Sequence, residues 1–435
     1  MQEDGPRRYN RGMTSVASQL EALVRTLAPG QLQVSIRAWD SSSLGPAEAP
    51  ATLVIHSPRA LRRLVWAPNE LGLGRAYVTG ELDIEGDVYA ALSLRDAVAA
   101  PDQPARVSGS RLAAVGAARR LGALGPPLAP PPEEARLWGR RHSKERDAAA
   151  VAHHYDVGND FYRLVLGPTL TYSCAYFERP DVALDAAQTA KYELISRKLG
   201  LVEGMRLLDV GCGWGGMVIH AAQHHGVTAV GVTLSRAQQE LAAKRVAEAG
   251  LQDRVVIRYQ DYRDVDDGPY DAISSIGMFE HVGLERLAEY FNRLFALLRP
   301  EGRLLNHGIS RPAAEGARFD PNSFIGRYVF PDGELHEIGA VVTAMQEQQF
   351  EVRDVESLRE HYARTLRQWV ANLEESWPEA VALVGEPRAR IWRLYMAGSA
   401  LNFEAGRTSL HQVLGVRPAS AGESAMPLTR RPFLG

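Results

Sequence analysis

The feature that most constrains the fold of this chain is a glycine-rich turn that joins an apolar run to a helical segment. Residues 206–210 (RLLDV) are typical of a buried strand, and the sequence GCGWGG follows at 211–216. Glycines let the backbone approach a ligand closely, and a helix beginning at Gly216 presents unpaired N–H groups at the same place. The turn therefore predicts a parallel sheet that binds a nucleotide-like ligand beyond the carboxyl ends of its strands.

The segments around this turn alternate between helix and strand. The pattern predicts helices over residues 187–199, 216–224, 235–249 and 284–298, and strands over 206–210, 227–233, 255–259, 270–275 and 302–307. Strands interleaved with helices of this length are typical of sheets covered by helices on both faces. We predict an α/β fold with a doubly wound, mostly parallel sheet.

The length of 435 residues favours more than one domain. A helix predicted over 16–28 and alternating strand patterns over 32–39 and 51–56 indicate a small α+β domain. Proline, glycine and arginine then become frequent, which indicates a linker. The predicted organisation is a disordered N-terminus at 1–14, a small domain at 15–96, a linker at 97–147, a main domain at 148–416 and a C-terminal tail at 417–435.

Charge and cysteine content limit the environment and the partners. Lys plus Arg (49) nearly balances Asp plus Glu (52), so no overall field would recruit nucleic acid. Two cysteines do not make a disulfide framework, and the first residues lack the apolar stretch of a signal peptide. No run approaches the ~18 apolar residues of a membrane span. These features predict a cytoplasmic protein. The histidines at 153–154 and 224–225 show no ligand spacing with acids or cysteines, so no metal is expected.

Two details narrow the ligand of the glycine turn. Asp209 stands two residues before the first glycine, which suits a compact amino-acid nucleoside better than a pyrophosphate. The next strand ends in Thr233-Leu-Ser-Arg-Ala-Gln238 without the acid that usually binds ribose, so hydroxyl and amide groups are expected there. Asp261-Tyr-Arg263, after the third strand, is expected to face an adenine. The turn resembles the first glycine motif of class I methyltransferases, which use S-adenosylmethionine, more than that of the rival dinucleotide oxidoreductases.

Further motifs carry a more specific resemblance. They are Tyr155-Asp-Val-Gly-Asn-Asp-Phe-Tyr162, Tyr172-Ser-Cys-Ala-Tyr176, Gly231-Val-Thr-Leu-Ser235, Asp261-Tyr-Arg-Asp264 and Gly277-Met-Phe-Glu-His-Val-Gly283. With the glycine turn, they resemble the cyclopropane-fatty-acyl-phospholipid synthase family, which includes the mycolic acid cyclopropane synthases. The resemblance covers roughly 148–416, and residues 15–95 are weakly similar to the family's N-terminal lipid-binding domain. It implies methyl transfer from S-adenosylmethionine to a cis double bond in a membrane phospholipid's acyl chain.

The resemblance also implies two sets of site residues. The residues expected to bind the cofactor by this resemblance are Tyr172, Ser173, Gly211, Gly213, Thr233, Gln238, Tyr262 and Arg263. The motifs add Tyr155, Asp209 and Asp261 to this set. The pocket for a bicarbonate ion falls on Cys174, Glu280, His307, the Ile309 backbone and Tyr362. Nothing beside Cys174 in the sequence would activate it as a nucleophile, so we interpret it as a pocket liner.

The implied reaction needs particular surroundings. An alkene is a poor nucleophile, so the methyl donor must be held in line with it in a water-free cavity. Aromatic faces can stabilise the resulting carbocation, and bound bicarbonate can remove a methyl proton. The aromatic candidates are Tyr172, Tyr176, Phe177, Phe279, Phe324 and Tyr328, of which Tyr172 and Phe279 adjoin motif residues most closely.

Two further segments and the basic residues bear on the product of the reaction and on the partners of the protein. Asn306-His-Gly-Ile-Ser-Arg-Pro312 and Asn402-Phe-Glu-Ala-Gly-Arg407 resemble methylene-forming relatives somewhat more than cyclopropane synthases, chiefly at Glu404. A methylene product would call for a reductase partner. Basic residues at 106–146 favour either a solvated linker or a cationic face on anionic phospholipid, which would hold the protein at the inner face of the plasma membrane. A non-enzymatic lipid-binding relative and a methyltransferase for a small amine or phenol are the alternatives, and a homodimer is left open.

Overall fold

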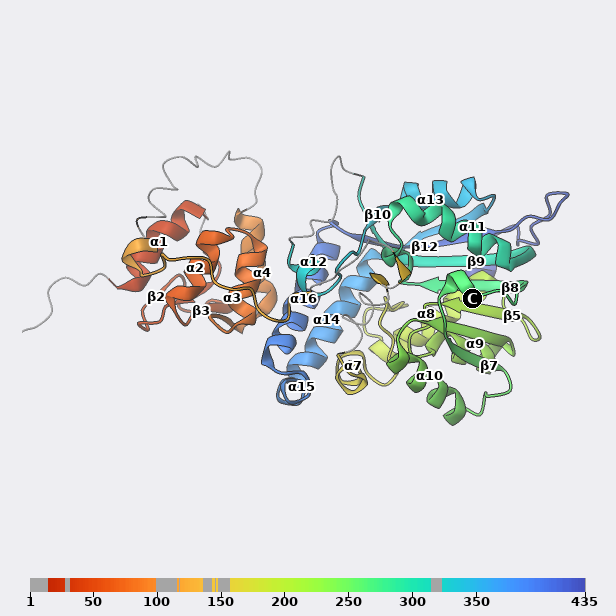
Figure 1. The fold of residues 1–435 in the computed structure, drawn as a ribbon, viewed down its shortest axis with the longest axis horizontal. Helices are drawn as coiled ribbons and strands as arrows, with labels where there is room; N and C mark the ends of the chain where they lie inside the picture. Colours follow the sequence, from red (N-terminus) through yellow and green to blue (C-terminus); the bar gives the residue numbers. More distant parts are fainter. Residues whose placement is uncertain are drawn as a thin grey trace, which may run out of the picture. The chain divides into compact units, whose positions relative to one another are not determined.

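A computed structural model describes residues 15–27, 32–98, 116, 118–135, 143–144, 146–147, 157–313 and 323–434. The chain forms two units, Met1–Pro132 and Glu133–Gly435, whose ribbons are drawn in Figure 1. The division falls inside the segment that composition predicts to be a linker. Among the described residues, no helix combines the length and the apolar character needed to cross a membrane.

The first unit is a small α+β fold. Its elements are α1 (Val16–Leu27), β1 (Ser35–Arg37), β2 (Ser43–Leu44), β3 (Ala51–Ile55), α2 (Pro58–Trp66), α3 (Glu70–Val78), β4 (Leu82–Gly86) and α4 (Val88–Val98). The strands form one sheet in the order β2-β1-β3-β4, in which β1 and β3 run parallel and the outer pairs antiparallel. The strand expected over 32–39 shortens to β1, whereas the one expected over 51–56 forms as β3.

Part of the expected linker belongs to the core of this unit. Ala118, Leu121 and Ala123 are buried and pack with Leu20 and Leu61. The frequent prolines and glycines of this region interrupt helices, but they do not stop the apolar residues between them from being buried. The prediction of a linker over 97–147 is therefore wrong for these residues.

The second unit carries the predicted α/β fold. Its helices are α7 (Asn159–Leu166), α8 (Leu184–Leu199), α9 (Gly216–His225), α10 (Arg236–Glu248), α11 (Leu287–Leu297), α12 (Phe324–Tyr328), α13 (Ile338–Glu347), α14 (Arg359–Glu375), α15 (Trp377–Val384), α16 (Glu386–Glu404) and α17 (Arg431–Leu434). Its strands are β5 (Arg206–Val210), β6 (Thr228–Thr233), β7 (Val255–Tyr259), β8 (Tyr270–Ile276), β9 (Leu298–Arg311), β10 (His336–Glu337), β11 (Glu351–Ser357) and β12 (Ser409–Val416). Short 3₁₀ turns are η1 (Tyr262–Asp264), η2 (Phe279–His281) and η3 (Leu284–Arg286).

The sheet has the order β11-β12-β9-β8-β5-β6-β7, with β10 added beside β9. Strands β5 to β9 pair in parallel, and β12 runs antiparallel to both β9 and β11. The chain passes from β5 outward to β7 and then returns to β8 on the other side of β5. Crossovers therefore diverge at β5, and a ligand site is expected at its carboxyl end. The predicted doubly wound, mostly parallel sheet is confirmed.

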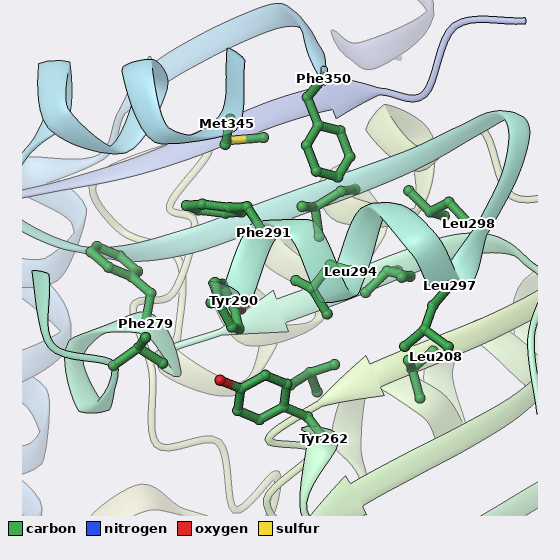
Figure 2. Packing of buried hydrophobic residues seen from close by; sticks show 14 of the residues in the cluster. Leu208, Tyr262, Phe279, Tyr290, Phe291, Leu294, Leu297, Leu298, Met345 and Phe350 are labelled. Carbon is green, nitrogen blue, oxygen red and sulfur yellow. The ribbon is translucent and has the colours of Figure 1, made fainter. Parts of the chain in front are cut away.

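Helices cover both faces of this sheet (Figure 1). Helices α11 and α13 pack on one face, where Tyr290, Phe291, Leu294 and Met345 meet strand residues such as Leu208 (Figure 2). Helices α8, α9 and α10 cover the other face around a second buried cluster. This second cluster includes Phe433 of α17, so the expected C-terminal tail packs at its end into the domain core and is not a free extension.

Candidate active site

A cavity lies at the carboxyl ends of β5, β6 and β8, where the glycine turn predicts it. The residues that line it are Leu170, Thr171, Tyr172, Ser173, Lys191, Tyr192, Asp209, Val210, Gly211, Cys212, Gly213, Trp214, Gly216, Met217, Val232, Thr233, Leu234, Gln238, Gln260, Tyr262, Ile276, Gly277, Met278 and His281. Most of the predicted cofactor set is among them. Tyr155 lies outside the described residues, and neither Asp261 nor Arg263 lines the cavity.

The backbone of the glycine turn explains its composition. Gly211 has φ 78° and Gly213 has φ 53°, a left-handed conformation that favours glycine. The turn also lies close against β6, because a Cβ on Gly231 would lie 2.8 Å from Cys212 Sγ. The amides of residues 211 and 212 both donate to the Val232 carbonyl at 3.0 Å. These contacts with β6 fix the position of the turn at the cavity.

Polar side chains at two strand ends face this cavity. Asp209 accepts a hydrogen bond from Ser274 Oγ at 2.7 Å, and burial raises the pKa of its carboxyl to about 6. At the end of β6, Thr233 Oγ1 donates to Gln238 Oε1 at 2.8 Å, and Ser235 caps α10 by accepting from the Gln238 amide. The hydroxyl and amide groups expected in place of a ribose-binding acid are therefore present.

Asp261 and Arg263 bind each other instead of facing the cavity. Arg263 donates to Asp261 Oδ2 at 2.6 Å and to Asp147 Oδ2 at 3.2 Å. The residue between them, Tyr262, lines the cavity. The cofactor role expected for Asp261 and Arg263 remains a prediction, and their observed contacts shape the η1 turn that presents Tyr262.

One residue of the 155–162 motif supports the glycine turn. Asn159 Oδ1 accepts from Trp214 Nε1 at 2.8 Å, and its Nδ2 donates to the Ala237 carbonyl. The side chain of Asn159 thus joins the glycine turn to the start of α10. Sequence analysis did not assign this role, because the three segments are brought together only by the fold.

A second group of polar residues lies at η2 and β9. Glu280 Oε1 accepts from the Ile309 amide at 2.7 Å, whereas Glu280 Oε2 is buried and has no hydrogen-bond partner among the described residues. Burial raises the pKa of Glu280 to about 7. This carboxyl therefore changes charge near neutral pH.

His307 presents a donor in the same region of β9. It is 1% exposed, and its Nδ1 accepts from Gln412 Nε2 at 3.2 Å. Burial lowers the pKa of His307 well below its usual range, so the ring is neutral and carries its proton on Nε2. In the part of the chain that the structure describes, this buried Nε2 has no partner. A buried donor and a buried carboxyl oxygen without partners fit an anion such as bicarbonate, which has both acceptors and a hydroxyl.

Cys174 and Tyr362 lie where the 173–177 segment runs beside the start of α14. Cys174 is fully buried with Sγ 3.7 Å from the Leu358 carbonyl, and the Ala175 amide donates to Thr365 Oγ1 at 3.0 Å. Burial raises the pKa of the Cys174 thiol, which keeps it protonated. These contacts agree with a lining role and with a weak nucleophile.

An aromatic cluster surrounds Tyr172 beside the cofactor cavity. Its ring stacks on Trp369 at a centroid distance of 5.3 Å, and its hydroxyl donates to the Tyr395 hydroxyl at 3.1 Å. Apart from this stack, the rings of the cluster contact one another edge-on or tilted. They come from α7, α14, α16 and Tyr172: Phe161, Tyr162, Tyr172, Tyr362, Trp369, Trp392, Tyr395 and Phe403.

The other aromatic candidates from the sequence lie elsewhere. Tyr176 stacks on His361, near which Phe177 also lies, and Phe324 packs on Tyr328. Phe279 belongs to the core on the α11 face, next to Glu280 (Figure 2). Tyr172 is therefore the candidate that lines the cavity, and the helices α14 and α16 supply the rings that sequence analysis missed.

Two buried polar residues of α8 also escaped prediction. Gln188 Nε2 donates to the Ser173 carbonyl at 2.8 Å, and Lys191 Nζ donates to Ser173 Oγ at 3.0 Å. They fix the segment that carries Tyr172 and Cys174. A charged or amide side chain is unusual on a helix face packed against a sheet, and this feature of the sequence could have indicated a role for both residues.

The fold assembles one group with metal-ligand geometry among the described residues. Glu193, His220 and His225 offer donor atoms that all lie within 4.8 Å of one another, although the spacing of histidines alone indicated no metal. The acid comes from α8 and the histidines from α9. Arg197 already binds the other oxygen of Glu193 at 2.8 Å, and both histidines are hydrogen-bonded to its carboxylate, so the group is satisfied as an internal network.

Basic residues near 140 are partly neutralised. Lys144 pairs with Asp264 at 2.6 Å, and Arg146 forms an ion pair with Asp332. Arg106, Arg111 and the basic residues at 136–142 lie outside the described residues. Any cationic membrane face therefore does not include Lys144 and Arg146 as free charges.

The chain is similar to known proteins over most of its length. Residues 142–413 match the family model described as mycolic acid cyclopropane synthetase. A Mycobacterium tuberculosis protein named "Probable fatty acid methyltransferase" is 44% identical over 96% of this chain and 98% of its own length. The cyclopropane-fatty-acyl-phospholipid synthase of Escherichia coli K12 is 38% identical over 66% of this chain and 72% of its own. The crystal structure of a mycolic acid cyclopropane synthase complexed with SAH and CTAB superposes with a TM-score of 0.59 at 37% identity, covering 62% of this chain and 98% of that one.

Proposed function

The chain belongs to the mycolic acid cyclopropane synthetase family and is an S-adenosylmethionine-dependent methyltransferase, and we propose that it methylates the cis double bond of an unsaturated acyl chain in a membrane phospholipid. The donor binds in the cavity at β5, β6 and β8, where the glycine turn and Thr233, Gln238 and Tyr262 contact it. The methyl group is directed toward Tyr172 and the aromatic cluster.

The aromatic cluster is the observation that carries this proposal. An acyl chain needs an apolar site, and the carbocation formed by methyl transfer is stabilised by aromatic faces, by ~2 kcal/mol or more per desolvated contact. Tyr172 belongs both to the cofactor cavity and to this cluster.

Glu280 and His307 would hold the base that takes a proton from the methyl group of the carbocation. Bicarbonate, when bound, supplies a weak base beside the transferred methyl group. His307 Nε2–H would donate to the anion, and Glu280 Oε2 would accept its hydroxyl or share a proton with it, because two bare anions would repel. Ile309 holds the Glu280 carboxyl in place, while Cys174 and Tyr362 close the pocket.

We assign the methylene-branched product in preference to the cyclopropane. The segments 306–312 and 402–407 support this choice. In the structure Glu404, the last residue of α16, forms an ion pair with Arg367 of α14 and so joins the two helices. A saturating reductase is the partner that this product requires.

Lipid contact is proposed to occur at the surface of the first unit. Trp66 of α2 is 56% exposed, and Leu73 and Leu124 are exposed by 44% and 41%. Trp66 Nε1 and Arg62 Nε donate to the adjacent carbonyls of Gly125 and Pro126, which places the tryptophan, the arginine and the 124–126 segment together. An indole beside a cation suits the interface of an anionic bilayer.

Mass spectrometry of fatty acids tests the proposal. The chain is expressed in a bacterium that makes unsaturated phospholipids but no branched or cyclopropane acids, and acyl methyl esters are analysed by gas chromatography. We expect a new acid that is 14 mass units heavier than an unsaturated fatty acid of the host and carries a methylene branch (C=CH2), and none with the Glu280→Gln variant. An unchanged profile, with S-adenosylhomocysteine still bound by the purified protein, would reject lipid methylation in favour of a small amine or phenol substrate.

A further inference from the structure

The cofactor cavity contains a buried cation that the proposed reaction does not use. Lys191 of α8 is fully buried, and its Nζ lies 3.0 Å from Ser173 Oγ and 4.1 Å from the centre of the Tyr192 ring. Both Ser173 and Tyr192 line the same cavity. An ammonium has three donor hydrogens, and burial without an anion costs several kcal/mol. The position therefore favours a negatively charged ligand.

A buried anion accompanies it. Asp209 lines the same cavity, and its hydrogen bond comes from the neutral Ser274 hydroxyl. Lys191 likewise bonds to a neutral hydroxyl and not to Asp209. The cavity thus offers one positive and one negative group that are each only partly satisfied by the protein. A zwitterion is the ligand chemistry that complements both.

S-adenosylmethionine has such a zwitterion at its methionine end. We propose that Lys191 binds the α-carboxylate of S-adenosylmethionine, opposite Asp209, which binds the α-ammonium group. This rests on the family's use of S-adenosylmethionine and not on the lipid substrate. Because Ser173 is adjacent to Tyr172, anchoring the methionine end at Lys191 turns the sulfonium methyl toward the aromatic cluster.

Asp209 attracts Lys191 without a hydrogen bond to it, and the other groups that interact with the Lys191 charge carry no negative charge. The Cys174 thiol and the His307 ring, both assigned to the proposed anion pocket, interact with the charge of Lys191, and both are neutral. Burial lowers the pKa of Lys191 to about 7, and a bound carboxylate would raise it again. Lys191 lines the cofactor cavity, whereas Cys174 and His307 do not, so the carboxylate is placed on the cofactor side.

Calorimetric binding of two ligands to the full chain tests the proposal. S-adenosylhomocysteine carries the amino-acid end, and 5′-methylthioadenosine lacks it. We expect Lys191→Met to weaken binding of S-adenosylhomocysteine by about tenfold or more, the effect of losing a charged hydrogen bond. Binding of 5′-methylthioadenosine should change by less than about threefold.

A second lysine of the same helix is the matched control. Lys198 is also buried in α8, but it pairs with Asp354 and Glu356 away from the cavity. Lys198→Met should lower the melting temperature and leave the ratio of the two affinities unchanged. Equal weakening of both ligands by Lys191→Met, or none, would overturn the proposal.

The wild-type protein provides a test that does not depend on folding of a variant. An analogue of S-adenosylhomocysteine without its α-carboxyl group should bind at least about tenfold more weakly than S-adenosylhomocysteine itself. Equal affinity would reject the carboxylate contact. If neither nucleoside bound at all, the cofactor site itself would be in question, which separates the two failures.

Discussion

Burial determines the charge state of the polar side chains at this site. Burial raises the pKa of the two acids, Glu280 and Asp209, and lowers the pKa of the two bases, His307 and Lys191. Both shifts favour the neutral form of the side chain. Glu280 and His307 can therefore hold an anion, and Lys191 and Asp209 a zwitterion, without a large net charge at either place before the ligand binds. Because the pKa values of Glu280 and Lys191 are about 7, binding at these two residues should depend on pH near neutrality.

The raised pKa of Glu280 predicts a pH-dependent effect on stability. The folded pKa of about 7 lies above the unfolded value of 4.5, so ionisation of Glu280 destabilises the fold as pH rises from about 4.5 through 7. Glu280→Gln should therefore melt about 2–4 °C higher than wild type at pH 8 in bicarbonate-free buffer. The difference should vanish below pH 4.5. The exposed Glu285→Gln is the control; a pH-independent difference for Glu280→Gln would contradict the assignment.

The environment of Cys174 predicts that covalent catalysis is absent. Because the thiol is fully buried and its pKa is raised, it is not a nucleophile at neutral pH. Cys174→Ser should keep activity within about tenfold of wild type. His307→Gln, by contrast, removes the buried donor and should lower kcat by about a hundredfold or more. Loss of all activity in Cys174→Ser, with cofactor binding intact, would instead support a covalent adduct.

At the level of elements, close packing of η2 on β9 positions Glu280 in the proposed anion pocket. A Cβ on Gly308 would lie 1.9 Å from Phe279 Cε1, so glycine is required for the ring to rest on the strand. Glu280 follows Phe279, and its carboxyl bonds to the Ile309 amide next to Gly308. The orientation of the carboxyl therefore depends on this contact between two elements.

Gly308→Ala tests that dependence. The added methyl group should displace Phe279, lower stability by about 1–3 kcal/mol and reduce kcat more than it changes cofactor affinity. Thermal melting, steady-state kinetics and calorimetry measure the three effects. Gly339→Ala in α13 meets no atom within 4 Å and should be neutral or slightly stabilising. Equal behaviour of the two variants would mean that the η2 contact does not position Glu280.

At the level of the whole molecule, the first unit is proposed to bring the enzyme to its lipid. The full chain should sediment with vesicles that contain anionic phospholipid, and added salt should weaken this binding through screening. Trp66→Ala should lower the bound fraction severalfold, because the indole is the largest exposed apolar group of α2. The similarly exposed Val202→Ala in the second unit is the control. Binding that is unaffected by Trp66→Ala would remove this surface from the proposal.

Local patterns predicted much of the second unit. The glycine turn, the strand from 206 to 210 and the helix that ends before Pro300 depend on neighbours in sequence, and they form as expected. Composition was misleading at residues 118–123 and at 431–434. There, a few apolar side chains between helix-breaking residues are buried by contacts with distant segments.

The sequence by itself determined the fold class, the cofactor turn and the family, because these depend on periodicity and on contiguous motifs. Only the tertiary structure decided that Lys191 meets Ser173, that Asp261 binds Arg263 away from the cavity, and that Tyr172 lies among the rings of α14 and α16. Such contacts depend on how helices pack on the sheet, and burial there sets pKa values that no local pattern encodes. The glycine turn thus predicts which cofactor binds, and the packing around it decides which side chains line the cavity.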